Sequence, residues 1–223
     1  MNLQLEKYIF KILGNQKRLE NYLGEYRWAF DMAQGLLVFT KKTGELITKC
    51  PIQIIGTEGY KANTWMWAWA NKKSNIPGNL LEGVNKVKQE AESDNQEIFL
   101  RSEIELSENL GARLAIICAG FLNHFSYFAC PYEGGCLYVT IEKSPIEEER
   151  SRNLPSMVTT IQMGLSSLEF SHKDALLSYL GDKPVELGNN KLRWDFENGN
   201  IEVDLDEKGR IAKLNSSMGG EKK

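Results

Sequence analysis

Three tryptophans stand at alternate positions in one short segment, Thr64–Asn71, whose sequence is TWMWAWAN. Because alternate side chains of a β-strand lie on the same face, Trp65, Trp67 and Trp69 would project together from such a strand. If that face were exposed, it would offer an aromatic surface on which a base, a sugar or another planar ligand could stack. If it were buried, the indoles would fill a core beneath a helix. The residues leave both interpretations open, and they favour burial because an exposed row of three indoles promotes aggregation.

Polar side chains that could act with the tryptophans stand at the ends of two predicted strands. Asp31 ends a strand that carries Trp28, and Asn71 ends the tryptophan strand. Either side chain could contact a ligand, although Asp and Asn at strand ends also commonly accept hydrogen bonds from turn backbone. The predicted ligand- or partner-binding residues are therefore Trp28, Asp31, Trp65, Trp67, Trp69 and Asn71.

Residues that catalyse reactions or bind metals are scarce. The chain has two histidines, His124 and His172, so a catalytic triad or a zinc site would have to use one of them. His124 could converge with Cys130 and Cys136 at a hairpin, but this cysteine spacing is not that of common zinc sites and a fourth ligand is missing. The sequence also lacks the phosphate-binding loop, the dinucleotide-binding glycine motif, the nucleophile elbow and the HExxH motif. We therefore predict no metal and no cofactor, and we assign no catalytic residue.

Composition excludes several classes of protein. Of the 223 residues, 42% are hydrophobic and 26% are charged, which is typical of a globular chain. The net charge of -3 gives no reason to expect a nucleic-acid partner. No apolar run is long enough for a bilayer, and Glu6, Lys7 and Lys11 interrupt any signal-peptide core at the N-terminus. With four cysteines expected as reduced thiols, we predict a cytoplasmic protein without a membrane partner.

Charge is unevenly distributed along the chain. Residues 1–75 contain eleven Lys and Arg against six Asp and Glu, whereas residues 76–170 contain seven against fourteen. This contrast could reflect a basic face for an anionic ligand, or self-association through oppositely charged faces. Ordinary solvated surface explains it more simply, because blocks of sequence are not patches in space.

The first 143 residues carry the pattern of one tryptophan-motif α+β domain. Apolar residues recur on one helical face over residues 3–23, and a strand pattern then repeats four times between glycine-containing turns. We expect strands at 27–31, 36–40, 46–55 and 64–71, a helix at 77–93, a strand at 97–106, a helix after Ser107, and strands at 125–130 and 136–143. This order predicts an α+β fold, with a mainly antiparallel sheet and helices packed on one face.

The remainder of the chain divides into three predicted parts. Residues 144–170 contain Pro145, Pro155 and three consecutive glutamates, so we predict a linker or mobile connection there. Residues 171–215 predict a helix that ends at Gly181 and a β-meander, either extending the first sheet or forming a separate lobe. We predict a disordered tail over residues 216–223.

The tryptophan segment also carries a family resemblance. The residues involved are Trp28, Phe30, Asp31, Leu37, Phe39, Ile55, Gly56, Thr57, Thr64–Asn71, Ile76 and Pro77. In this pattern the chain resembles a group of uncharacterised bacterial proteins that share a TWxWAWAN motif. The resemblance covers roughly residues 1–140 and is specific at the tryptophan segment. It implies a shared fold for that part and nothing about activity.

Two functional hypotheses follow. The first, which we favour, is a non-catalytic binding or interaction protein that holds a small planar ligand or a protein partner at a tryptophan-lined face. The second is a small enzyme of unfamiliar type, in which a carboxylate near the tryptophans, such as Asp31 or Glu58, acts as acid or base. Self-association is left open by both.

Overall fold

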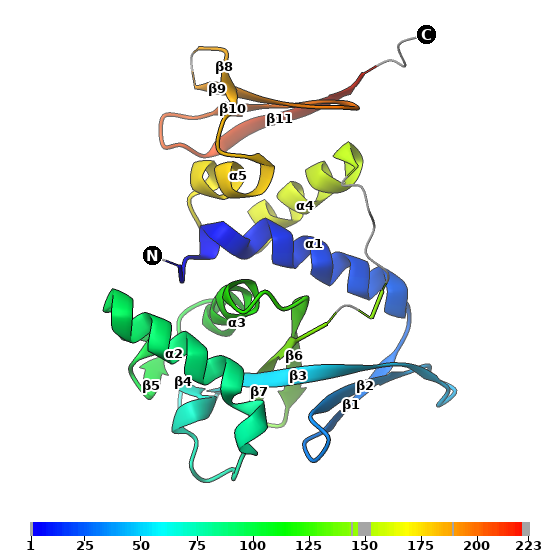
Figure 1. The fold of residues 1–223 in the computed structure, drawn as a ribbon, viewed down its shortest axis with the longest axis vertical. Helices are drawn as coiled ribbons and strands as arrows, with labels where there is room; N and C mark the ends of the chain where they lie inside the picture. Colours follow the sequence, from blue (N-terminus) through cyan, green and yellow to red (C-terminus); the bar gives the residue numbers. More distant parts are fainter. Residues whose placement is uncertain (1, 144, 147–152, 189, 220–223) are drawn as a thin grey trace. The chain divides into compact units, whose positions relative to one another are not determined.

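The structure is a computed structural model that describes residues 2–143, 145–146, 153–188 and 190–219. Its helices and strands confirm the predicted α+β class, with mainly antiparallel sheets (Figure 1). The chain forms two compact units, of which one comprises Met1–Gln4 with Asn15–Glu148 and the other comprises Leu5–Gly14 with Glu149–Lys223. Helix α1 (Leu5–Leu23) therefore contributes its first part to the second unit and its last part to the first unit.

The first unit is built around a seven-stranded antiparallel sheet. Its strands are β1 (Arg27–Asp31), β2 (Leu36–Thr40), β3 (Leu46–Gly59), β4 (Thr64–Trp67), β5 (Glu103–Glu105), β6 (Ser126–Tyr132) and β7 (Gly135–Ile141). The strands β1 to β5 pair in sequence order, while β7 pairs with both β3 and β6. Strand β3 is the longest of the sheet's strands and pairs with β2, β4 and β7 along its length.

Glycines permit two of the hairpin turns of this sheet. Gly44 between β2 and β3, and Gly134 between β6 and β7, have φ angles of 92° and 88°. Residues with a side chain rarely adopt such angles, so the hairpin turns depend on glycine at these positions.

Two helices pack against the sheet of the first unit. Helix α3 (Leu110–Phe121) contacts β3, β6 and β7, and it is buried along most of its length because nearly all its side chains are apolar or small. Helix α2 (Glu82–Asp94) contacts β3 and α3. The predicted helix at 77–93 thus begins later than expected, because Pro77 is followed first by a short 3-10 turn, Gly78–Leu80.

The second unit has its own four-stranded antiparallel sheet, in the order β11-β10-β9-β8. The strands are β8 (Val185–Glu186), β9 (Lys191–Phe196), β10 (Gly199–Leu205) and β11 (Ile211–Met218), and the helices are α4 (Leu154–Ser167) and α5 (His172–Leu180). In the described part of the chain these strands do not pair with the first sheet, so the meander does not extend it.

Helix α4 lies where the sequence predicted a linker. Pro155 occupies one of the first helical positions, where its missing N–H is not needed, and the Asn153 side chain caps the helix by accepting a hydrogen bond from the Ser156 N–H at 2.8 Å. The proline thus starts a helix instead of interrupting one. Residues 144 and 147–152 of the predicted linker lie outside the described residues.

Strand β11 extends into the predicted tail. It runs to Met218 because its backbone pairs with β10 as far as Gly199. Residues 220–223 of the predicted tail lie outside the described residues.

Candidate functional site

Two of the three motif tryptophans lie in the hydrophobic core of the first unit. Trp65 and Trp67 on β4 are both 0% exposed, and their rings meet edge to face at 5.4 Å. Trp65 also contacts Tyr138, and the Trp67 Nε1–H donates a hydrogen bond to the Ile98 carbonyl at 3.1 Å. In this arrangement the two indoles stabilise the sheet and offer no surface to a ligand.

Trp69 does not continue the row of indoles. Strand β4 ends at Trp67, and Ala68–Ala70 form a 3-10 helix that the Asn71 N–H closes with a hydrogen bond to the Ala68 carbonyl. The strand is therefore shorter than predicted, and its alternation stops before Trp69. The Trp69 ring lies instead under the Lys88 ammonium of α2, which is 4.2 Å from the ring centroid.

The other predicted site residues are placed apart from the tryptophan strand or serve turns. Asp31 Oδ1 accepts a hydrogen bond from the Gln34 N–H at 3.0 Å, and Asn71 Oδ1 accepts one from the Ser74 N–H at 3.2 Å. Trp28 is half-buried on β1 and contacts Phe128 edge to face. In the strand order, β2 and β3 separate β1 from β4, so Trp28 and Asp31 do not share a strand pair with the tryptophan segment.

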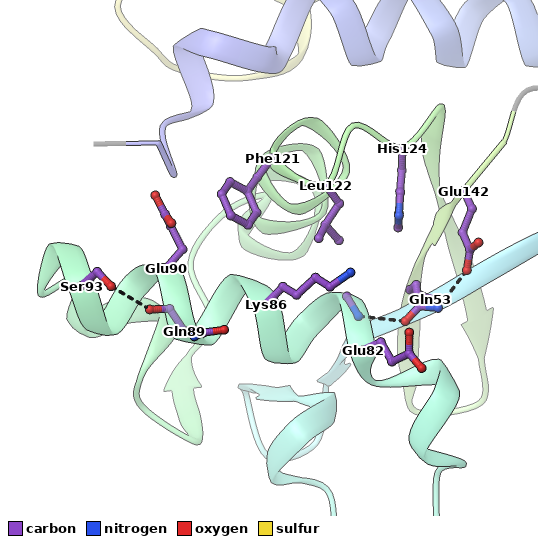
Figure 2. Close-up of a pocket in the computed structure, with 11 residues that line it drawn as sticks. Gln53, Glu82, Lys86, Gln89, Glu90, Ser93, Phe121, Leu122, His124 and Glu142 are labelled. Atoms are coloured by element: carbon purple, nitrogen blue, oxygen red, sulfur yellow. Dashed lines mark hydrogen bonds between the residues drawn. The ribbon is translucent and has the colours of Figure 1, made fainter.

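A polar groove lies elsewhere on the first unit, beside helix α2 (Figure 2). Its volume is about 540 Å³, which suits a small molecule. The groove is lined by Gln53, Glu82, Gly83, Lys86, Gln89, Glu90, Ser93, Phe121, Leu122, His124 and Glu142. Helix α2 provides its share at spacings of three and four residues, which places these side chains on one helical face. The remaining residues come from β3, from the end of α3 and the turn after it, and from the position directly after β7.

The Gln53 amide organises the inner end of the groove. Gln53 is only 8% exposed, and each polar atom of its amide has a partner. Its Nε2–H groups donate to the Asn79 carbonyl at 3.0 Å and to Glu142 Oε1 at 2.8 Å, while its Oε1 accepts from the Gly83 N–H at 2.9 Å. The amide therefore joins β3 to the start of α2 and holds the Glu142 carboxylate in one orientation.

Gly83 allows α2 to approach the sheet at this point. A Cβ atom on Gly83 would lie 3.0 Å from Leu122 Cδ1 and 3.2 Å from Gln53 Cγ. These distances are closer than ordinary van der Waals contact, so the Leu122 or Gln53 side chain would have to shift by a few tenths of an ångström to accommodate a Cβ atom. The absence of a Cβ atom at Gly83 thus leaves room for the close approach at which its N–H donates to Gln53.

His124 faces the same end of the groove. Its Nδ1 lies 2.9 Å from Oγ1 of Thr140, a fully buried neighbour of Gln53 across the pairing of β3 and β7. Burial lowers the pKa of His124 below its usual value, the Glu142 charge opposes this shift, and the Lys86 charge adds to it. The groove therefore presents a neutral imidazole at neutral pH.

Glu58, a carboxylate considered for catalysis, lies at the start of α3. Its Oε1 accepts a hydrogen bond from the Gly111 N–H at 3.0 Å, so the carboxylate interacts with the positive end of the helix dipole. The pKa of the Tyr138 hydroxyl is raised mainly by burial and also by the nearby Cys136 and Glu58. The arrangement stabilises the helix terminus, and Glu58 does not line the groove.

The cysteines are buried and free. Burial raises the pKa of Cys50 and Cys136 to about 11 and that of Cys130 to about 12, and it also raises the pKa of Cys118. Within the described residues, no group of three or more His, Cys, Asp or Glu side chains could hold a metal ion.

Sequence reasoning missed the groove, although one signal for it was present. Gln53 interrupts the apolar run Ile52-Gln53-Ile54-Ile55, and a polar residue inside a buried strand needs hydrogen-bond partners. The partners themselves could not be identified, because they come from a loop, a helix and a strand end far away in the sequence. The polar residues of α2 carry no sequence signal that separates them from ordinary solvated surface.

The fold and the groove together define an α+β protein with a buried polar network at the base of a surface groove. Residues 5–144 match a family of unknown function (DUF6882), and the chain belongs to that family. All the residues that line the groove fall within the matched segment. Comparison with curated proteins and with solved structures found no match to this chain. None of the helices in the described ranges is long and apolar enough to cross a membrane.

Proposed function

We propose that this protein is a non-catalytic binding protein that holds a small polar molecule in the groove beside α2. The observation that carries the proposal is the Gln53 network at the base of the groove. Burial of an amide is unfavourable unless each of its polar atoms has a hydrogen-bond partner, so each partner must be positioned accurately. Here the network fixes Glu142 and the start of α2, which are the two sides of the groove's inner end.

The tryptophans support this proposal as positioning residues. Trp69 packs under Lys88 of α2, and Trp67 hydrogen-bonds the Ile98 carbonyl in the short 3-10 helix, Glu97–Phe99, that contacts α2. Both contacts restrain the helix that forms one wall of the groove. We therefore propose that Trp67 and Trp69 support a site formed by other residues. Nothing comparable in the described chain links Trp28, Asp31, Trp65 or Asn71 to the groove, and their predicted binding role stays a prediction.

Location and origin form part of the same proposal. The four buried free thiols support a reducing compartment, so we place the protein in the cytoplasm. The TWMWAWAN segment supports a bacterial origin through the resemblance described above. A protein partner or self-association would add to the groove's role without replacing it.

The catalytic alternative rests on a different residue. Glu58 is a half-buried carboxylate beside Tyr138 and Cys136, and acid–base chemistry would require it to exchange protons with a substrate. Its Oε1 already accepts the hydrogen bond from the Gly111 N–H at the start of α3, so this oxygen is engaged by the helix terminus. Binding at the groove is therefore the better-supported function.

A ligand screen with matched variants tests the proposal. The full chain is screened against a library of small polar metabolites by thermal shift, and each hit is repeated with Glu142→Gln and Lys86→Met. As a control, Lys213→Met removes an exposed cation from β11 in the other unit. We expect hits whose stabilisation is reduced in the two groove variants and kept in the control. If no compound stabilises the protein, or if every hit is equally affected by the control substitution, the groove is not the binding site.

A further inference from the structure

Lys86 forms no ion pair with any described residue, although it lies in a groove that contains several carboxylates. Glu82 and Glu90 lie four residues before and after Lys86 on α2, which is the spacing at which helical ion pairs form. Neither pair forms among the described residues, and Glu90 Oε1 instead accepts a hydrogen bond from Asn2 Nδ2 at 2.6 Å. In Figure 2 the Lys86 ammonium points toward Gln53, at the end of the groove where His124 and Glu142 lie.

Another side of this end presents a carboxylate oxygen that has no hydrogen-bond partner among the described residues. Glu142 uses Oε1 to accept the Gln53 hydrogen bond, and in the described part of the chain its second oxygen accepts none. His124 uses Nδ1 toward Thr140, and its Nε2 likewise has no partner within the described chain. The exposed Lys86 ammonium and the Glu142 carboxylate thus line one groove from two different elements, and they do not form an ion pair with each other in the described chain.

A ligand with a single charge would match only one of these groups. An amine would place its charge near Lys86, and a carboxylate would place its charge near Glu142, so each would meet repulsion as well as attraction. A molecule with adjacent ammonium and carboxylate groups matches both. The half-buried Phe121 and Leu122 add an apolar surface to the same groove.

We propose that the groove binds a free α-amino acid in its zwitterionic form, with an apolar side chain. Its carboxylate lies against the Lys86 ammonium, its ammonium group lies against the second oxygen of Glu142, and its side chain packs along Phe121 and Leu122. The inference deepens the proposed function and rests on it. A peptide N-terminus lacks the adjacent carboxylate, so it provides no negative charge for the Lys86 ammonium.

Analogues that lack one charge test the inference directly. Binding of L-leucine to the full chain is measured by titration calorimetry and compared with isoamylamine, which lacks the carboxylate, and isocaproate, which lacks the amine. L-phenylalanine, phenethylamine and hydrocinnamate form a second series with a larger side chain. We expect at least one of the two amino acids to bind, and each of its analogues to bind about tenfold more weakly or worse, because a charge-assisted contact is lost.

Two isosteric variants assign the charges to residues. Lys86→Met keeps the aliphatic stem, and Glu142→Gln keeps an oxygen that can accept the Gln53 hydrogen bond. We expect Lys86→Met to bind the amino acid about tenfold more weakly than the unsubstituted protein does, and to bind the amine analogue equally well. We expect Glu142→Gln to bind the amino acid about tenfold more weakly too, and to bind the carboxylate analogue equally well.

The failures of the two proposals are distinguishable. If a singly charged analogue binds as tightly as its amino acid, or if neither amino acid binds, the zwitterion inference is overturned. The groove itself is then judged by the metabolite screen: a different class of hit that is lost in both variants keeps the proposed function, whereas the absence of any hit removes both.

Discussion

Gln53 and Glu142, 89 residues apart in the chain, are joined by a hydrogen bond of 2.8 Å from the Gln53 amide to the Glu142 carboxylate. The same amide accepts the Gly83 N–H, so one side chain connects β3, α2 and the residue that follows β7. This relationship makes the groove a part of the folded core of the first unit, and it links ligand binding to stability in the predictions that follow.

Replacement of Gln53 should destabilise the protein strongly. Gln53→Ala removes three hydrogen bonds and leaves the buried Gly83 N–H without its acceptor. We expect the free energy of unfolding to fall by about 2–4 kcal/mol, measured by urea denaturation. Gln89→Ala, at an exposed position of the same groove, is the matched control and should change stability by less than about 0.5 kcal/mol. Equal effects of the two substitutions would show that the Gln53 network contributes nothing to stability.

The two buried tryptophans should differ in their tolerance of phenylalanine. Both Trp65→Phe and Trp67→Phe leave unfilled space in the core, because both indoles are fully buried. Only Trp67 loses a hydrogen bond, since its Nε1–H donates to the Ile98 carbonyl, whereas Trp65 Nε1 has no partner in the described structure. We expect Trp67→Phe to cost about 1 kcal/mol more than Trp65→Phe in urea denaturation. The opposite order would contradict the hydrogen-bond assignment.

Acid should weaken the second unit through His172. The His172 Nδ1 accepts a hydrogen bond from the Ile211 N–H at 3.0 Å, which it can do only when that nitrogen is unprotonated. Burial, followed by the Arg210 charge, lowers the pKa of His172, while Asp206 acts in the opposite direction. Because the unfolded chain then binds the proton more readily, this stabilisation is complete above the ordinary pKa of about 6.5 and is lost as pH falls through the folded-state value.

Urea midpoints measured between about pH 7.5 and pH 5.5 check this sign, since the ordinary histidine pKa lies inside that window. We expect the midpoint to fall toward acid and to fall less steeply in His172→Asn, which offers an acceptor that gains no proton. His124, whose pKa is also lowered, contributes a slope of the same sign, so His124→Asn is the companion variant. A midpoint that rises toward acid would refute the assignment for both histidines.

The thiols should be unreactive in the folded protein. All four cysteines are buried and free, and burial raises the pKa of each. Because the thiolate is the reactive form, we expect slow labelling by an aromatic disulfide reagent at about pH 8 and complete labelling of four thiols in urea. Rapid labelling of the native protein would show that a cysteine is more exposed than the structure indicates.

Much of the fold could be predicted from local pattern. The hairpin strands at 27–31 and 36–40 match β1 and β2 residue for residue, because turn glycines and alternating apolar side chains act over a few neighbouring residues. The helix after Ser171 also ends at Gly181 as expected. Local pattern did not predict α4, because it treated Pro155 as a residue that interrupts a helix. In the structure Pro155 occupies one of the first positions of α4, where proline is well tolerated.

The sequence by itself determined the α+β class, most of the strands and the family resemblance of the tryptophan segment, since these depend on residue type and short-range spacing. Only the tertiary structure decided that Trp65 and Trp67 are buried while Trp69 packs on α2. It also decided that Gln53, Lys86, His124 and Glu142 line one groove. The physical reason is that burial and long-range hydrogen bonds depend on which elements pack together, and that packing joins residues far apart in the chain.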